Sequence, residues 1–382
     1  MSGWKRVKLR DCVEEVNERT TENNQYEVLT SSKSGIYSQE DYFDKQVASK
    51  DNTGYKIIKR GQFTYRSMSD NGTFTINRLE NRDIGIVSPA YPVFEAISIN
   101  PEYLKYFFQS EGFRKEIYNL SQGSTRTALK YKDLSNIEIL LPSIKEQEKI
   151  VEILSRIDEI SIKNREKINL YIKRKNAIVD SILKKIKYKR KKVKEVAEIY
   201  LGLTHKPKYV KVGIPFLSSQ NVSSGYLDFD NTKYISQEEF DRASNTIKPK
   251  NGDVLFSRVG SNLGNPVIVD VDIDFGIYVS LGYLRAKENI DNKFLKQWIS
   301  SKEFSNQIRT KVSGGAKNNI NTGWLKEFNI TIPELEEQRK FARILENIDK
   351  ENIKLKEEIE QYEILKKGLM QQLLTGKIRV KI

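Results

Sequence analysis

LLPSIKEQEKIVEILSRID (residues 140–158) and TIPELEEQRKFARILENID (residues 331–349) are two versions of one motif in a chain of 382 residues. Both contain a proline, a Glu-Gln pair, an Ile-Leu pair and an Ile-Asp pair at the same internal spacing, with an offset of 191 residues. Matches at this offset continue outside the motif: Gly61 with Gly252, Gly85 with Gly276, and Leu134 with Leu325. A constant offset of half the chain length indicates one structural unit that is used twice.

Each motif opens a segment that we expect to be a long helix. Pro142 disfavours helix in the residue before it, and Ser143 with Glu146 has the spacing of a capping box. Apolar residues then recur at steps of three and four, interrupted in the first copy by Ser161, Asn164 and Lys175. This period predicts a coiled-coil seam, whose first positions are Ile150, Leu154, Ile157, Phe341, Leu345 and Ile348.

Each of these segments is about 40 residues long, which at 1.5 Å per residue gives a rod of roughly 60 Å. Alone, such a rod would expose its apolar stripe to water. Packing of each helix on its own domain is the alternative, but the length is excessive for it. We therefore expect the two helices to pair, and the domain between them allows them to run antiparallel.

The sequence before each helix is rich in strands and turns. Short β-rich runs are separated by Gly, Asn and Asp, and one amphipathic helix is expected in each half, over residues 101–120 and 292–312. The fold class is therefore α+β: two α/β domains, each followed by a long helix, with the two helices forming an antiparallel coiled coil. The expected divisions are 1–142, 143–190, 191–333 and 334–382.

The composition indicates a soluble, cytoplasmic protein with a polyanionic partner. Hydrophobic residues make up 38% of the chain, and no run approaches the length of a membrane span. The single cysteine, Cys12, excludes an intramolecular disulfide. The formal charge of +14 favours nucleic acid as the partner, although charge can also serve solubility alone. The segment 143–190 has 14 basic and 7 acidic residues, so phosphate contacts along this rod and a merely solvated face are both open.

The sequence offers little for catalysis. With one histidine, His205, and one cysteine, it cannot supply a zinc site of Cys and His ligands, and it has no phosphate-binding glycine loop. Asp270 and Asp272 alternate with Val and Ile, which is the pattern of an ordinary half-exposed strand. We predict no catalytic and no metal-binding residue.

Polar, basic turns recur in both halves and are the candidate DNA-reading segments. Two of them, TYRSMSDNGT (64–73) and FSRVGSNLGN (256–265), follow the aligned glycines, and two more, SQGSTRTALK (121–130) and VSGGAKNNIN (312–321), follow the predicted helices. A third candidate is LSSQNVSSG (217–225), for which the first half offers LTSSKSG (29–35). Arg, Lys, Asn and Gln can read base edges because they supply paired donors and acceptors. The predicted DNA-binding residues are Arg66, Asn71, Arg126, Lys130, Gln220, Asn221, Arg258, Asn262, Lys317 and Asn319.

The whole chain resembles the specificity subunits of type I restriction–modification systems. The resemblance rests on the doubled proline-to-Glu-Gln helix opening and, in the second half, on GLTHKP, NGDVLFSRVG and the terminal QQLLTGKIRV. The last of these has no counterpart after the first helix, where residues 183–190 read LKKIKYKR.

The resemblance implies two target recognition domains, each reading half of a bipartite site in double-stranded DNA, held apart by a helical ruler. It further implies two methyltransferase (modification) subunits as partners, joined by restriction/translocase subunits in the full complex. S-adenosylmethionine, ATP and Mg²⁺ would bind those partners, and no cofactor is expected in this chain.

Two alternatives stay open at this stage. One is a stand-alone sequence-specific DNA-binding or scaffold protein with a coiled-coil rod. The other is a nuclease that uses Asp270 or Asp272.

Overall fold

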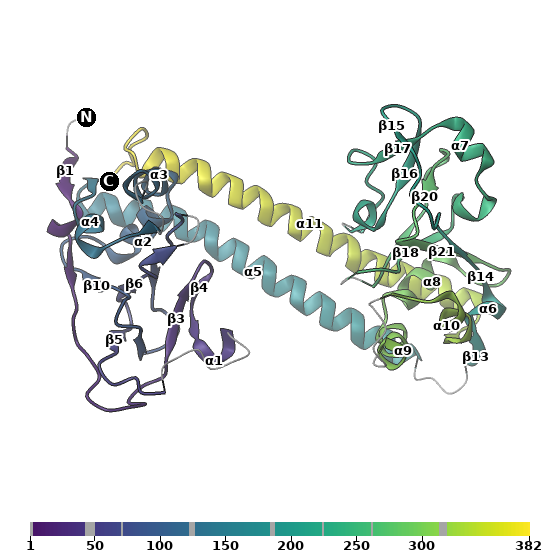
Figure 1. Ribbon diagram of the computed structural model, residues 1–382, viewed down its shortest axis with the longest axis horizontal. Coiled ribbons are helices and arrows are strands. Elements are labelled where there is room, and N and C mark those ends of the chain that lie inside the picture. Colours follow the sequence, from purple (N-terminus) through teal and green to yellow (C-terminus); the bar gives the residue numbers. More distant parts are fainter. Residues whose placement is uncertain are drawn as a thin grey trace. The chain divides into compact units, whose positions relative to one another are not determined.

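A computed structural model describes residues 3–42, 50–69, 72–121, 127–183, 188–223, 225–260, 263–312 and 319–382. The chain forms two compact units. Unit 1 comprises residues 1–164 and 356–382, and unit 2 comprises residues 165–355. Each unit therefore has a strand-rich part, which we call its head, together with part of both long helices (Figure 1).

Head 1 is built around α2 (Pro101–Gln109) and a four-stranded sheet in the order β2-β10-β6-β8. That sheet comprises β2 (Val13–Glu15), β10 (Val93–Ala96), β6 (Phe63–Thr64) and β8 (Asn77–Arg78). Two-stranded pairs accompany it: β1 (Lys5–Lys8) with β12 (Glu138–Leu141), β3 (Leu29–Ser32) with β4 (Gly35–Ser38), β5 (Lys56–Lys59) with β9 (Ile84–Val87), and β7 (Met68–Ser69) with β11 (Thr127–Ala128). The remaining helices are α1 (Gln39–Tyr42), α3 (Glu111–Ser121) and α4 (Tyr131–Ser135).

Head 2 repeats this plan. Its four-stranded sheet has the order β14-β21-β18-β19, from β14 (Ala197–Leu201), β21 (Leu281–Ala286), β18 (Val254–Ser257) and β19 (Gly264–Ile268). The pair β13 (Lys189–Lys192) with β22 (Asn329–Ile332) corresponds to β1 with β12. A second sheet contains β15 (Tyr209–Val210), β17 (Lys233–Ile235), β16 (Ile214–Leu217) and β20 (Gly276–Ile277). The helices are α6 (Val193–Val196), α7 (Gln237–Arg242), α8 (Asn292–Ile299), α9 (Lys302–Val312) and α10 (Thr322–Glu327).

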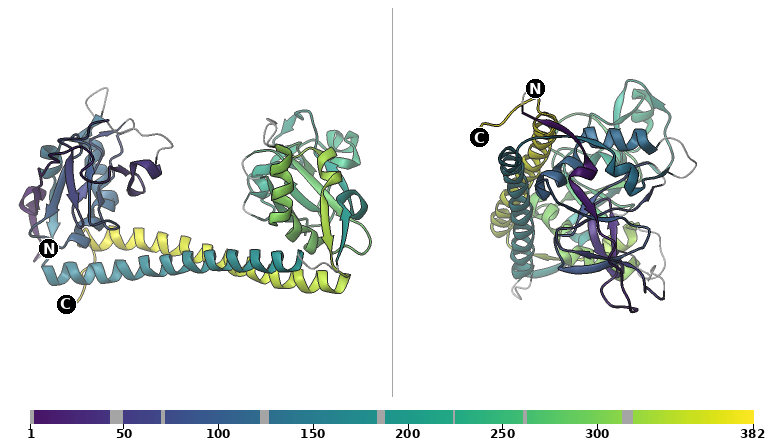
Figure 2. Two further views of the ribbon diagram at one scale, coloured as in Figure 1. Left: turned by 90° about the horizontal axis from the view of Figure 1, so that it is seen from below. Right: turned by 90° about the vertical axis from the view of Figure 1, so that its left-hand side faces the viewer.

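The two long helices are α5 (Ile144–Leu183) and α11 (Leu335–Leu373), of 40 and 39 residues. They run antiparallel within each unit. In unit 1, Asn164 Nδ2 donates to Glu358 Oε2 at 3.1 Å, and Asp158 pairs with Lys366. In unit 2, Lys175 pairs with Asp349. The predicted fold class is confirmed, and in each unit the head lies along one side of its stretch of paired helices (Figure 2).

The glutamine of the doubled motif explains why the motif is needed twice. Gln147 is 1% exposed: its Oε1 accepts from Asn100 N at 2.8 Å, and its Nε2 donates to Pro142 O at 2.9 Å. Gln338 makes the same two bonds, with Asp291 N at 2.9 Å and Pro333 O at 2.9 Å. Because Asn100 and Asp291 cap α2 and α8, this glutamine joins the head's helix to the start of the long helix in each unit.

The single amphipathic helix expected in each half is in fact two helices, so that prediction was wrong. α2 ends at Gln109 and α8 ends at Ile299, and the break falls at a serine in both units. Ser110 Oγ accepts from Phe113 N at 3.2 Å, and Ser301 Oγ accepts from Phe304 N at 3.3 Å. A serine at this position competes for the backbone donors of the following turn, so it starts a new helix.

The predicted seam positions are mostly buried. Ile150 and Leu154 are 0% exposed and pack in unit 1 with Met370, Leu373 and Leu374. Ile157 is also buried, and Leu345 and Ile348 pack with Val179 in unit 2. Phe341 is only half-buried, and the neighbouring Ala342 is the buried residue there.

Candidate nucleic-acid interface

Two arginines follow equivalent strands of the two heads, but their surroundings differ. Arg66 comes two residues after β6 and is exposed, with no hydrogen-bond or ion-pair partner among the described residues. Arg258 follows β18 directly and is 8% exposed. An exposed guanidinium can approach a DNA base or phosphate, whereas a buried one makes its hydrogen bonds within its own domain.

Arg258 holds two segments of head 2 together. Its Nε donates to Ile320 O at 3.2 Å, and its two terminal nitrogens donate to Val279 O at 3.3 Å and Asn319 Oδ1 at 3.1 Å. All three acceptors are neutral, and burial lowers the pKa of the guanidinium below its ordinary value. Arg258 and Asn319, predicted separately as reading residues, are thus joined by a hydrogen bond.

Gln220 and Asn221 are neighbours with opposite placements. Asn221 is 5% exposed, and its Oδ1 accepts from Ser218 N at 2.9 Å, while its Nδ2 donates to the carbonyls of Asp228 at 3.1 Å and Asn231 at 3.2 Å. These bonds fix the turn. Gln220 is exposed on that turn, with its side chain free of partners in the described part of the chain.

Lys130 is exposed at the start of α4, where its carbonyl accepts the first helical bonds from Asp133 N and Leu134 N. Four further predicted residues lie outside the described residues: Asn71, Arg126, Asn262 and Lys317. The side chains that the structure leaves open for a ligand are therefore those of Arg66, Lys130 and Gln220.

One basic loop that the sequence analysis passed over is also exposed. Between β14 and β16, the side chains of Lys206, Lys208 and Lys211 face solvent without a carboxylate partner in the described part of the chain. Three lysines within six residues could have been recognised as candidate phosphate contacts, but only their exposure separates such a cluster from an ordinary polar turn.

Nothing in the described residues assembles a metal site. Three or more His, Cys, Asp or Glu side chains that could hold an ion do not come together within those ranges. Asp270 and Asp272 are exposed, and Asp272 accepts from Asn251 Nδ2 at 2.8 Å. These two aspartates therefore do not form the carboxylate cluster that the nuclease alternative needs.

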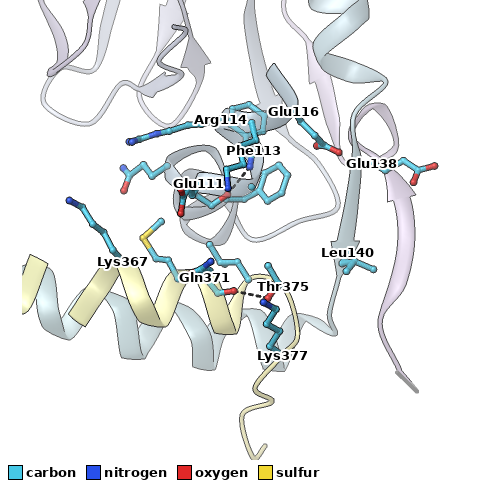
Figure 3. A pocket seen from close by; sticks show the side chains of 17 residues that line it. Glu111, Phe113, Arg114, Glu116, Glu138, Leu140, Lys367, Gln371, Thr375 and Lys377 are labelled. Carbon is cyan, nitrogen blue, oxygen red and sulfur yellow. Dashed lines mark hydrogen bonds and ion pairs between the residues drawn. The ribbon is translucent and has the colours of Figure 1, made fainter. Parts of the chain in front are cut away.

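A cavity of about 630 Å³ lies in unit 1 between α3 and the last turns of α11 (Figure 3). Aromatic and aliphatic side chains form part of its lining, including Phe107, Phe113 and Met370. Arg114, Lys367 and Lys377 lie around it, as do Glu111 and Glu116 (Figure 3). Burial and the nearby Glu138 raise the pKa of Glu116 above its ordinary value. None of the predicted DNA-binding residues lines this cavity.

Within the described residues, no helix combines the length and the apolar character needed to cross a membrane.

The chain matches the family model of the type I restriction modification DNA specificity domain twice, over residues 1–174 and 185–362. The chain belongs to this family. The two matched regions correspond to the two heads with their long helices, so each half of the repeat is one specificity domain.

Curated relatives carry the same description. The type I restriction enzyme MjaVIII specificity subunit of Methanocaldococcus jannaschii is 28% identical over 274 residues, which is 65% of this chain and 64% of that protein. The type I restriction enzyme EcoKI specificity subunit of Escherichia coli is 26% identical over 202 residues, covering 47% of this chain and 41% of that protein. The match thus spans under two thirds of the length of either relative.

Solved structures show the same fold at low sequence identity. The S subunit of a type I restriction–modification system from M. genitalium aligns with a TM-score of 0.59 at 14% identity, over 97% of this chain and 96% of that one. A chain from work on complex assembly and conformational transition of the type I restriction–modification system aligns with a TM-score of 0.53 at 17% identity, over 99% of both chains. The fold is therefore that of a known S subunit.

Proposed function

We propose that this chain is the non-catalytic DNA-recognition subunit of a type I restriction–modification complex, in which each head reads one half of a bipartite site. The observation that carries the proposal is the duplication itself. Both heads keep the sheet order and the glutamine that joins head to helix, while the loops after β6 and β18 present different side chains. One scaffold with exchanged loops is what two different half-sites require.

In this proposal, Lys and Arg contacts to phosphates position the duplex, and loop side chains read base edges in the major groove. Arg66 and Lys130 in head 1 and Gln220 in head 2 are the exposed candidates for reading. Asn221, Arg258 and Asn319 stabilise the loops through hydrogen bonds within head 2. The lysines of residues 206–211 are candidate phosphate contacts.

We further propose that two methyltransferase subunits dock on the long helices, with restriction/translocase subunits joining them. Exposed apolar side chains recur along both helices and support the proposal, since extended exposed apolar surface marks interaction sites. Ile162 is 52% exposed on α5, and Ile353, at the equivalent position of α11, is 45% exposed. S-adenosylmethionine, ATP and Mg²⁺ would be bound by those partners, and the complex would act in the cytoplasm.

Mapping methylated adenines in the host genome, with and without this gene, tests the proposal. The expected result is a bipartite motif of fixed spacing whose methylation disappears when the gene is deleted. An unchanged methylation map would overturn it.

Mixing the purified chain with a methyltransferase subunit from the same host separates the proposal from a stand-alone DNA-binding protein. The proposal requires a complex, and a stand-alone protein predicts none. Metal-dependent cleavage of DNA by the chain alone would instead support a nuclease.

A further inference from the structure

Asp158 on α5 contacts side chains of two other helices of unit 1, α2 and α11. Its Oδ2 accepts from the hydroxyl of Tyr106 on α2 at 2.8 Å. Lys366 on α11 donates to Oδ1 at 2.6 Å and to Oδ2 at 2.8 Å, and its ammonium lies 4.9 Å from the centre of the Tyr106 ring. The Asp158 carboxylate therefore contacts the head and the opposite long helix at once.

Unit 2 has the same junction at the same offset. Asp349 on α11 accepts from Gln297 Nε2 on α8 at 2.9 Å. Lys175 on α5 donates to Asp349 Oδ1 at 2.5 Å and to Oδ2 at 2.8 Å. The aspartate and the lysine are kept in both units, while the head supplies a tyrosine in one and a glutamine in the other. What is kept is a donor from the head, not a particular side chain.

These junctions are partly enclosed. The lysine side chains are 18% and 17% exposed, and the aspartate side chains are 37% and 28% exposed. A shielded ion pair adds little net stability, because desolvation offsets the attraction, but it penalises every arrangement that separates the charges. Such a pair suits the fixing of a geometry better than the strengthening of a fold.

The junction is also the second of two attachments between the head's helix and the long helix. The first is Gln147, which holds the start of α2 at Asn100. Asp158 lies 11 residues further along α5, which at 1.5 Å per residue is about 16 Å away, and it holds the last turn of α2. One attachment would let the head pivot, whereas two along the same helix fix its angle.

We propose that Asp158 and Asp349 are positioning residues that fix the angle between each head and the long helices. They thereby determine how strictly the chain selects the spacing between its two half-sites. The spacing part of this inference rests on the proposed function. The angle part does not.

The angle is tested on the full chain without DNA. Cys12 is the only cysteine and is buried, so spin labels can be placed selectively at E22C in head 1 and K163C on α5, both exposed positions in unit 1. We expect a narrow distance distribution that broadens in Asp158→Asn. Glu159→Gln, the same change at the next and exposed residue, is the matched control and should leave the distribution narrow.

The spacing is tested in the complex with its methyltransferase. The substrates are plasmids in which the mapped half-sites are separated by the native spacer or by one or two base pairs more or fewer. We expect the preference for the native spacer to fall about tenfold in the Asp158→Asn, Asp349→Asn double variant, equivalent to about 1.4 kcal/mol. Glu159→Gln with Glu351→Gln should keep the wild-type preference.

An unchanged preference in the double variant, with methylation retained, would overturn the spacing part, and an unbroadened distance distribution would overturn the angle part. If the double variant does not fold, Tyr106→Phe removes only the head's donor and is expected to broaden the distribution and relax the preference in the same direction. Failure of the wild-type chain to direct any methylation would instead refute the proposed function, and the spin-label result would still decide the angle.

Discussion

The same surface differs between the two units: it borders a cavity in unit 1 and carries a hydrogen-bonded glutamate in unit 2. In unit 2, Glu303 accepts from Trp298 Nε1 at 3.1 Å and from Thr331 Oγ1 at 3.3 Å, and Arg190 lies 3.5 Å from it. The equivalent positions in unit 1 are Phe107, Gly112 and Leu140, which line the cavity of about 630 Å³. These three positions of unit 1 therefore have no carboxylate, no indole and no hydroxyl.

Neighbouring positions follow the same division. Gln307 in unit 2 exchanges two hydrogen bonds with the backbone of Asn329, at 2.7 and 2.8 Å. Glu116 takes its place in unit 1 and has no such bond among the described residues. The duplication has thus kept the backbone, while this surface carries a polar network in unit 2 and lines a cavity in unit 1. The heads are equivalent in how they attach to the helices and unequal in how they are packed.

Truncating the large ring at this surface should have the largest effect. Trp298 is 2% exposed and contacts Phe304 edge to face at 5.0 Å between ring centres, so Trp298→Ala should cost about 3–5 kcal/mol. Phe107→Ala, the matched change, should cost about 1–2 kcal/mol less because Phe107 already borders empty space. Amide hydrogen exchange, compared between α8 and α9 in unit 2 and α2 and α3 in unit 1, measures the local stability of each unit separately. Equal losses would contradict this difference in packing between the two units.

The two arginines offer the next contrast. Arg258→Ala removes the donor of one buried and two partly buried acceptors, so we expect a loss of about 1–3 kcal/mol in the stability of head 2. Arg66→Ala should change stability by less than about 0.5 kcal/mol. It should weaken discrimination at one base of the head 1 half-site by about 1–3 kcal/mol, measured from methylation of single-base variants. Unchanged discrimination at every base would remove Arg66 from the interface.

Glu303 should make the stability of unit 2 depend on pH. Burial raises its pKa above the ordinary value, although Trp298, Arg190 and Thr331 oppose the shift. A carboxyl with a raised folded pKa stabilises most below its unfolded pKa of about 4.3, and that contribution is lost as pH rises through the folded value. Glu303→Gln keeps an acceptor but cannot ionise, so it should remove this decline. Urea unfolding between pH 4 and 7 checks this, and parallel curves for the two proteins would contradict it.

The smallest effect is expected from Gly112→Glu, which places a glutamate in unit 1 at the position equivalent to Glu303. A Cβ at Gly112 would meet nothing within 4 Å, and Gly112 lies inside α3. Gly112→Glu should therefore be tolerated and should gain up to about 1 kcal/mol from helix propensity. Thermal unfolding of the variant gives the value, and a clear loss of stability would show that the cavity does not admit a side chain there.

The duplication, the two long helices and most buried seam positions were predictable from the sequence because letter matches and helical period are local signals. The equivalence of β1 and β13 was not. Lys5 and Lys189 occupy the same ladder position but are offset by 184 residues, not 191, and short basic strands carry no periodic signal. In the seam, Ala342 is buried where Phe341 was predicted, because helical periodicity alone does not decide which of two adjacent residues faces the partner helix.

The sequence could not predict which of the polar side chains on the candidate turns face outward and which support the turn. Arg258 and Asn221 lie on the predicted turns, yet both face inward, because their side-chain nitrogens donate to backbone carbonyls of head 2. Residue type cannot distinguish a polar side chain that faces a groove from one that supports a loop, since both need the same donors and acceptors. Whether the exposed set reads DNA stays a prediction.

The composition of the units has a consequence for how the protein is made. Unit 2 is one uninterrupted stretch of chain, whereas unit 1 needs residues 356–382, and Glu146 in its core is held by Trp4 and Arg379 together. All residues of unit 2 are translated before residues 356–382. Head 1, although translated first, waits with Leu154 and its neighbours uncovered until the last helix emerges. Unit 1 is therefore the first to be started, yet it cannot be complete before every residue of unit 2 has been made.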